Sequence, residues 1–130
     1  MIDVTCAVIV QDSKVFICRR NPEKSLGGFW EFPGGKVEAG ESYRECLARE
    51  LKEELGMEVV VKQHILSVEH EYSDISVKLI AFECDVLTFH GPMNDHDLCD
   101  WRSVEDLHKL KLAPADIPIV EALSDRLLLG

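Results

Sequence analysis

The chain has 130 residues, 46% hydrophobic and 29% charged, which is the composition of an ordinary globular domain with an apolar core. Its apolar runs are too short to span a bilayer, and no basic segment precedes an apolar one near residue 1, so we expect neither a membrane segment nor a secretory signal. The formal net charge of −10 disfavours nucleic-acid polymers, but a small phosphorylated ligand is compatible with it where a metal ion reverses the local charge.

The first part of the chain is predicted to form a hairpin followed by a loop. A run rich in β-branched residues predicts a buried strand over Ile2–Val10, and polar turn residues separate it from a return strand over Val15–Cys18. The segment Arg19–Gly35 contains two prolines and four glycines, so we expect it to be a loop.

One helix is specified more sharply than any other element. Ser42 and Glu45 form a capping box at its start, and Gly56 stands where the residue after a helix end belongs. Three leucines recur at every fourth position between them, which predicts a core-facing stripe of Leu47, Leu51 and Leu55.

The remaining elements are predicted from apolar patterning. We expect strands over Val59–Glu71 and Ile75–Leu87, a loop over His90–Asp97 and a short strand over Cys99–Arg102. Helical spacing of apolar residues predicts a last helix within Pro114–Leu128. Strands on both sides of the capped helix, together with a second helix, predict an α/β fold with helices on both faces of a mixed sheet.

The cysteines carry no pairing pattern. Their number is odd, and no C-x-x-C pair occurs among Cys6, Cys18, Cys46, Cys84 and Cys99. Neither a disulfide framework nor a zinc knuckle is indicated, and we expect free thiols in a reducing cytoplasm.

Three carboxylates share one face of the capped helix. Glu50, Glu53 and Glu54 stand at i, i+3 and i+4, turned away from the leucines, and like charges so placed repel one another. Two interpretations follow from the triplet alone: a solvated acidic face, or a site for a hard divalent cation such as Mg²⁺.

The flanking residues favour the cation site. In Gly34-Gly35-Lys36, glycines permit close approach of the backbone to a ligand, and lysine can meet a phosphate as a point charge. Arg49 lies between the acids and can hold a carboxylate by a bidentate hydrogen bond.

The same region matches a long pattern. Gly35, Glu41 and the run Arg49–Met57 fit G-x5-E-x7-R-E-U-x-E-E-x-G-U, with U aliphatic, at every fixed position. On this motif the chain resembles the Nudix hydrolase superfamily.

Further segments extend the resemblance over nearly the whole chain. Arg19-Arg20 and the run Trp30–Lys36 look like those of MutT-type nucleoside triphosphate pyrophosphohydrolases, and the tail Ala113–Pro118 looks like their CTP pyrophosphohydrolase branch. The resemblance implies a single Nudix domain over residues 1–130, built as an α/β/α sandwich around a mixed sheet.

The resemblance also implies a set of metal ligands. Mg²⁺, or alternatively Mn²⁺, is expected on Glu50, Glu53 and Glu54 with the backbone carbonyl of Gly34. Asp95 is the candidate for a further acid from a loop, although it can equally be an ordinary polar loop residue.

The implied substrate contacts lie outside the acidic cluster. Arg20, and less specifically Lys36, would contact the phosphates, and Phe32 would pack by the base. Asp116 stands where 8-oxoguanine-specific MutT enzymes carry asparagine. An ionised aspartate only accepts hydrogen bonds, so it suits the exocyclic amine of cytosine or adenine and disfavours the O6 of guanine. Alternatively, Asp116 caps the C-terminal helix.

The expected reaction is Mg²⁺-dependent hydrolysis of CTP, dCTP or a modified dCTP to the monophosphate and pyrophosphate. Glu50 or Glu53 would take the proton from the attacking water, beside Arg49. The alternatives are hydrolysis of 8-oxo-dGTP, a Nudix enzyme acting on ADP-ribose, NADH or capped RNA, and a non-catalytic nucleotide sensor. Because every acid of the motif is present, catalysis is favoured over sensing; the oligomeric state stays open.

Overall fold

The computed structural model describes residues 1–90 and 96–129. Two helices of thirteen residues, a short helix and a 3-10 turn are distributed among the strands. In chain order the elements are β1 (Ile2–Val8), β2 (Val10–Gln11), β3 (Lys14–Arg20), β4 (Trp30–Glu31), β5 (Gly34–Lys36), α1 (Tyr43–Leu55), β6 (Met57–Glu71), β7 (Ser76–Phe89), β8 (His96–Arg102), α2 (Val104–Leu107), the 3-10 turn η1 (Pro114–Asp116) and α3 (Ile117–Leu129).

The strands form two sheets. The first has the order β5-β1-β7-β6, and it is mixed because β1 runs parallel to β7 and antiparallel to β5. In the second sheet β3 pairs antiparallel with β2, β4 and β8. The mixed sheet predicted from the sequence is confirmed.

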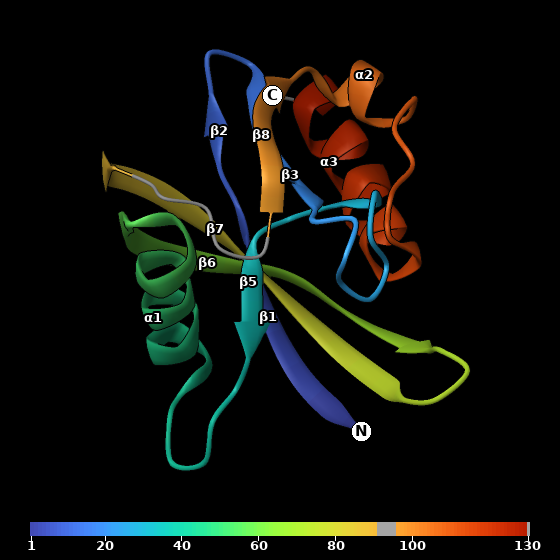
Figure 1. Cartoon of the computed structure of the whole chain (residues 1–130). Coiled ribbons are helices and arrows are strands. Elements are labelled where there is room, and N and C mark those ends of the chain that lie inside the picture. Colours follow the sequence, from blue (N-terminus) through green and yellow to red (C-terminus); the bar gives the residue numbers. More distant parts are fainter. Residues whose placement is uncertain (91–95, 130) are drawn as a thin grey trace.

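Successive residues of the central strands face opposite helices, which makes the fold a three-layer sandwich (Figure 1). On β1, Cys6 packs in the cluster of Ile119, Val120 and Leu123 from α3, whereas its neighbour Ala7 packs in the cluster of the α1 leucines. Leu79 and Ile80 of β7 divide between the clusters in the same way. The helices therefore cover opposite faces of the sheet, as the α/β/α expectation required.

Helix α1 begins and ends where the sequence predicts. The Ser42 hydroxyl accepts from the N–H of Glu45 at 3.1 Å, and the Glu45 carboxylate accepts from the N–H of Ser42 at 3.0 Å. Gly56 takes the left-handed conformation (φ 60°) and donates its N–H to the carbonyl of Lys52 at 3.0 Å. The three predicted leucines are fully buried, and each contributes roughly 2 kcal/mol through removal of apolar surface from water.

Two predictions about the first third of the chain are wrong in detail. The strand expected over Ile2–Val10 is interrupted at Ile9, because β1 belongs to the mixed sheet and β2 to the antiparallel one. The loop expected over Arg19–Gly35 contains the end of β3, all of β4 and the start of β5. Its glycines and prolines indicate turns correctly, but pairing with distant strands also orders this segment.

Differences in the second half are smaller. Strand β8 begins at His96, earlier than expected, and part of the predicted loop before it, residues 91–95, lies outside the described residues. Helix α2 was not predicted, and the tail opens with the turn η1 before α3 begins. No helix within residues 1–90 and 96–129 has the length and apolar character needed to cross a membrane. All five cysteines are free thiols, as expected.

Candidate active site

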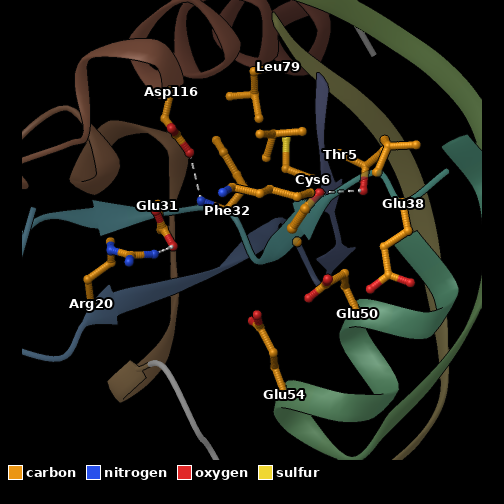
Figure 2. A pocket seen from close by; sticks show the side chains of 15 residues that line it. Thr5, Cys6, Arg20, Glu31, Phe32, Glu38, Glu50, Glu54, Leu79 and Asp116 are labelled. Atoms are coloured by element: carbon orange, nitrogen blue, oxygen red, sulfur yellow. Dashed lines mark hydrogen bonds and ion pairs between the residues drawn. The ribbon is translucent and has the colours of Figure 1, made fainter. Parts of the chain in front are cut away.

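A cavity of about 600 Å³ lies between α1 and the strands of both sheets. Figure 2 shows the carboxylates of Glu50 and Glu54 rising into it from α1, and Asp116 on the opposite side. The cavity is lined by residues from seven elements and the segments between them, namely Val4, Thr5, Cys6, Arg20, Glu31, Phe32, Gly34, Gly35, Lys36, Val37, Glu38, Glu50, Glu54, Leu79 and Asp116. The same cavity is therefore lined by the acidic residues of α1 and by Asp116, the residue predicted to contact the base.

Arg49 organises the acidic side of this cavity. Its Nε and Nη2 donate to the two oxygens of Glu41 at 2.9 and 2.8 Å, which is the bidentate geometry predicted from the sequence. Its Nη1 donates to Glu50 Oε1 and Glu53 Oε2, each at 3.0 Å, and Nη2 also donates to the carbonyl of Lys36 at 3.2 Å. One guanidinium therefore ties α1 to β5 and to the segment between them.

The same contacts set the charges of the network. Hydrogen bonds from Arg49 are the main cause that lowers the pKa of Glu41 to about 2. In return, Glu41 raises the pKa of Arg49 above its ordinary value. Both groups stay ionised across the working pH range, so the anchor persists.

The three carboxylates of the predicted metal site are not equivalent. Arg49 holds both Glu50 and Glu53, but Glu50 and Glu54 line the cavity and Glu53 does not, with 60% of its side chain exposed against 14% for Glu50. Among the described residues no three His, Cys, Asp or Glu side chains converge closely enough to hold a metal. The arrangement still fits a hard cation, because Mg²⁺ is commonly held by one or two carboxylates together with substrate phosphates and water.

Two glycines bring the backbone of β5 close to its neighbours. A Cβ at Gly34 would collide with the backbone carbonyl of Thr5 on β1, to which β5 is paired. A Cβ at Gly35 would collide with the carboxylate of Glu50. Gly35 therefore leaves space for the carboxylate of Glu50, and Gly34 allows β5 to pair closely with β1.

Arg20 lies on the cavity wall with part of its donor set engaged. Its Nε donates to the carbonyl of Ser25 at 2.7 Å, and its Nη1 pairs with Glu31 Oε2 at 3.1 Å (Figure 2). The guanidinium carries five N–H groups in a rigid fork, so donors remain for a phosphate. Lys36 also lines the cavity and is exposed.

The opposite end is formed by Phe32 and Asp116. Asp116 is 5% exposed, and its Oδ2 accepts from the backbone N–H of Phe32 at 2.8 Å. Burial, followed by the negative charge of Glu31, raises the pKa of Asp116 well above its usual value, while the Phe32 N–H and Arg20 oppose that shift. Among the described residues the Asp116 carboxylate bonds to the backbone of Phe32, between β4 and β5 and 84 residues away, and to no N–H of α3, so the alternative that Asp116 caps the last helix is not supported.

The structure also brings in residues that the sequence analysis did not single out. Glu31 pairs with Arg20, and Val4, Cys6 and Leu79 form an apolar wall. Val4 and Cys6 are two residues apart on a strand, so the sequence indicates that they point to the same face of the sheet. It does not indicate which other residues that face contacts. Arg49 and Glu53 stand beside the cavity without lining it, and Asp95 lies outside the described residues.

Comparison with known proteins places this geometry in a family. Residues 4–122 match the NUDIX domain family. The CTP pyrophosphohydrolase of Escherichia coli K12 is 42% identical over 124 residues, covering 94% of this chain and 90% of that protein. A putative 8-oxo-dGTP diphosphatase 2 of Mycobacterium tuberculosis is 36% identical over 117 residues, covering 87% and 81%. The solution structure of the E. coli ORF135 protein superposes with a TM-score of 0.80 at 41% identity, covering 96% of this chain and 89% of that one.

The two glycines predict opposite phenotypes. Gly35→Ala displaces only the end of the Glu50 side chain, so we expect near-native stability and at least a ~10-fold loss of pyrophosphate release from a nucleoside triphosphate. Gly34→Ala would push the backbone of β5 away from that of β1, so we expect the urea concentration at the midpoint of unfolding to fall. Native activity in Gly35→Ala would contradict the placement of Glu50.

Asp116→Asn predicts a pH-dependent gain in stability. Because the folded pKa of Asp116 is raised, folded Asp116 keeps a proton that the unfolded chain releases above about pH 4, so wild-type stability falls as the pH rises towards the folded pKa. Asparagine still accepts from the Phe32 N–H and does not ionise. The advantage of the variant in urea unfolding should therefore grow from pH 4 upward, whereas Asp125→Asn, at an exposed position, provides the control. An advantage that does not change with pH would contradict the burial argument.

Proposed function

The chain belongs to the NUDIX domain family and is a hydrolase of pyrophosphate bonds, and on this premise we propose that its substrate is CTP, dCTP or a 5-substituted dCTP. The products would be the nucleoside monophosphate and pyrophosphate, with Mg²⁺ or alternatively Mn²⁺ as the cofactor. The observation that carries the proposal is the buried Asp116, anchored on Phe32 in the same cavity that Glu50 and Glu54 line. Free thiols support a place in the reducing cytoplasm.

The acidic side of the cavity supports cation binding. Glu50, Glu54 and the carbonyl of Gly34 would hold the ion, with Glu53 and Asp95 as further ligands. A bound divalent cation would neutralise phosphate charge and lower the pKa of a bound water. Arg49 pairs with Glu41, which precedes α1, and with Glu53 on α1, and these ion pairs offset the repulsion between the acids around the cavity.

Glu50 is the better of the two candidates for accepting the proton of the attacking water. It lines the cavity and Glu53 does not. Arg49 engages Glu50 Oε1, and within the described part of the chain Oε2 has no hydrogen-bond partner. A fixed carboxylate with one open oxygen is suited to taking a proton at a defined position. Arg20 and Lys36 would bind the phosphates, independently of the base.

Asp116 would select the base by its hydrogen-bonding character. One oxygen is used by Phe32, and the ionised carboxylate offers only further acceptors, which match the exocyclic amine of cytosine. A guanine O6 in the same place would leave two acceptors facing each other, at about 1–3 kcal/mol or more. Phe32 contributes its backbone N–H to the anchor, while the residue is 3% exposed and its side chain packs in the core.

A second candidate, hydrolysis of 8-oxo-dGTP, is favoured by one observation. The pKa of Asp116 is raised, and a protonated carboxyl donates a hydrogen bond that the O6 of guanine can accept. The relative from M. tuberculosis bears the name of that activity. The two candidates differ in the protonation state of one side chain, so they respond oppositely to pH.

The cation end is tested with Glu54→Gln. We expect kcat/KM for CTP to fall by about 100-fold or more under saturating Mg²⁺, because the variant loses a charged ligand, with stability unchanged or slightly increased by the relief of like charges. Glu58→Gln, on the exposed side of β6, is the control and should stay near wild type. Pyrophosphate release is followed while Mg²⁺ is titrated; wild-type kinetics in Glu54→Gln would remove Glu54 from the site.

The base end is tested with Asp116→Asn in a substrate panel at fixed Mg²⁺. Asparagine both donates and accepts, so the ratio of kcat/KM for CTP over 8-oxo-dGTP should fall by about 10-fold or more. In the wild type the same ratio should rise with pH as Asp116 ionises. If the wild type prefers 8-oxo-dGTP at every pH, or the variant keeps the wild-type ratio, the cytosine assignment is wrong.

A further inference from the structure

The turn that carries Asp116 is fixed from several sides. Before η1, the N–H of Ala113 donates to the carbonyl of Trp30 at 2.8 Å, and the N–H of Trp30 donates to the carbonyl of Lys111 at 2.8 Å. After it, α3 packs into the core through Ile119, which is fully buried. Within the turn, the contacts that set its position are the bond from Phe32 to Asp116 and a second bond at Ala115.

The acceptor of that second bond is the residue directly after β6. The hydroxyl of Tyr72 accepts from the backbone N–H of Ala115 at 3.3 Å. Ala115 is 4% exposed, and among the described residues its N–H has no other acceptor. A buried N–H left without a partner is strongly unfavourable, so the hydroxyl holds this turn in place.

Tyr72 is itself positioned by its surroundings. Its N–H donates to the carbonyl of Ile75 at 2.8 Å, which closes the β6–β7 hairpin, and its ring meets the His70 ring edge-on at 4.5 Å between centroids. It lines a cavity of about 380 Å³ that shares Arg20, Glu31 and Lys36 with the candidate active site. Burial raises the pKa of Tyr72, and the hydrogen bond from the Ala115 N–H opposes that shift only in part, so the hydroxyl stays neutral.

We infer that Tyr72 is a positioning residue for base selection: its hydroxyl holds Ala115, and through Ala115 it fixes the angle at which Asp116 meets the base. The inference rests on the proposed function of Asp116. Ala115 and Asp116 are adjacent, so a shift of one moves the other, whereas Glu50 and Glu54 on α1 lie on the other side of the cavity. Tyr72 therefore acts on recognition of the base and leaves the reacting end of the cavity unchanged.

The test is Tyr72→Phe against Tyr43→Phe. Tyr43 is the other tyrosine of the chain, and its hydroxyl also makes one hydrogen bond, to Asp3 Oδ2 at 2.8 Å on the α1 side. Both variants remove a single hydroxyl and keep the ring. We expect Tyr72→Phe to raise KM for CTP and lower the CTP over 8-oxo-dGTP ratio of kcat/KM by about three- to tenfold, the size of one neutral hydrogen bond, with kcat within twofold of wild type. Tyr43→Phe should leave the ratio unchanged.

A second readout does not depend on substrate. In amide NMR spectra of the full chain, Tyr72→Phe should shift the resonances of both Ala115 and Phe32, because the donor to Asp116 reports the position of the turn. The inference is overturned if the amide resonances of Phe32 and Ala115 do not shift. It is also overturned if Tyr72→Phe and Tyr43→Phe have the same CTP over 8-oxo-dGTP ratio of kcat/KM. If the wild type shows no preference for CTP, the proposed substrate fails instead, and the amide shifts alone decide whether Tyr72 holds the turn.

Discussion

The guanidinium of Arg49 is the contact on which the acidic half of the pocket depends. A helix face with glutamates at i, i+3 and i+4 is self-repelling, and a further glutamate precedes it in the chain. Arg49 binds Glu41 with two hydrogen bonds and Glu50 and Glu53 with one each, and it reaches the carbonyl of Lys36. It thereby offsets the repulsion and locks β5 against α1. Of the acids of α1, Glu50 and Glu54 line the cavity, and within the described part of the chain Glu50 Oε2 has no hydrogen-bond partner.

The other half of the pocket depends on burial rather than on charge. Asp116 is almost completely enclosed, and one backbone donor from Phe32 fixes its direction. The site is therefore polarised, with an acidic side that we propose binds the cation and a secluded carboxyl that we propose contacts the base. Arg20 lies on the wall of the same cavity, paired with Glu31.

What the sequence predicts well is what local chemistry decides. Ser42, Glu45 and Gly56 act through neighbours within one turn, and the leucine stripe needs only helical periodicity, so α1 matches its prediction. Strands β4 and β5 were not predicted, because they are extended through pairing with β3 and β1 and their own composition does not indicate strands. The three glutamates look alike in sequence, and only the packed structure shows that Glu53 is 60% exposed and lies outside the cavity, whereas Glu50 is 14% exposed and lines it. The bond between Phe32 and Asp116 spans 84 residues, which no local pattern contains.

We propose that the divalent cation binds on the open side of α1, at Glu50 and Glu54. Titration of the isotope-labelled chain with Mn²⁺ tests it directly, since the paramagnetic ion broadens the amide resonances nearest to it. We predict the strongest broadening at Gly34, Glu50 and Glu54, with a weaker effect at Asp116. Broadening centred instead on another acidic pair, such as Glu83 and Asp85 of β7, would contradict the claim.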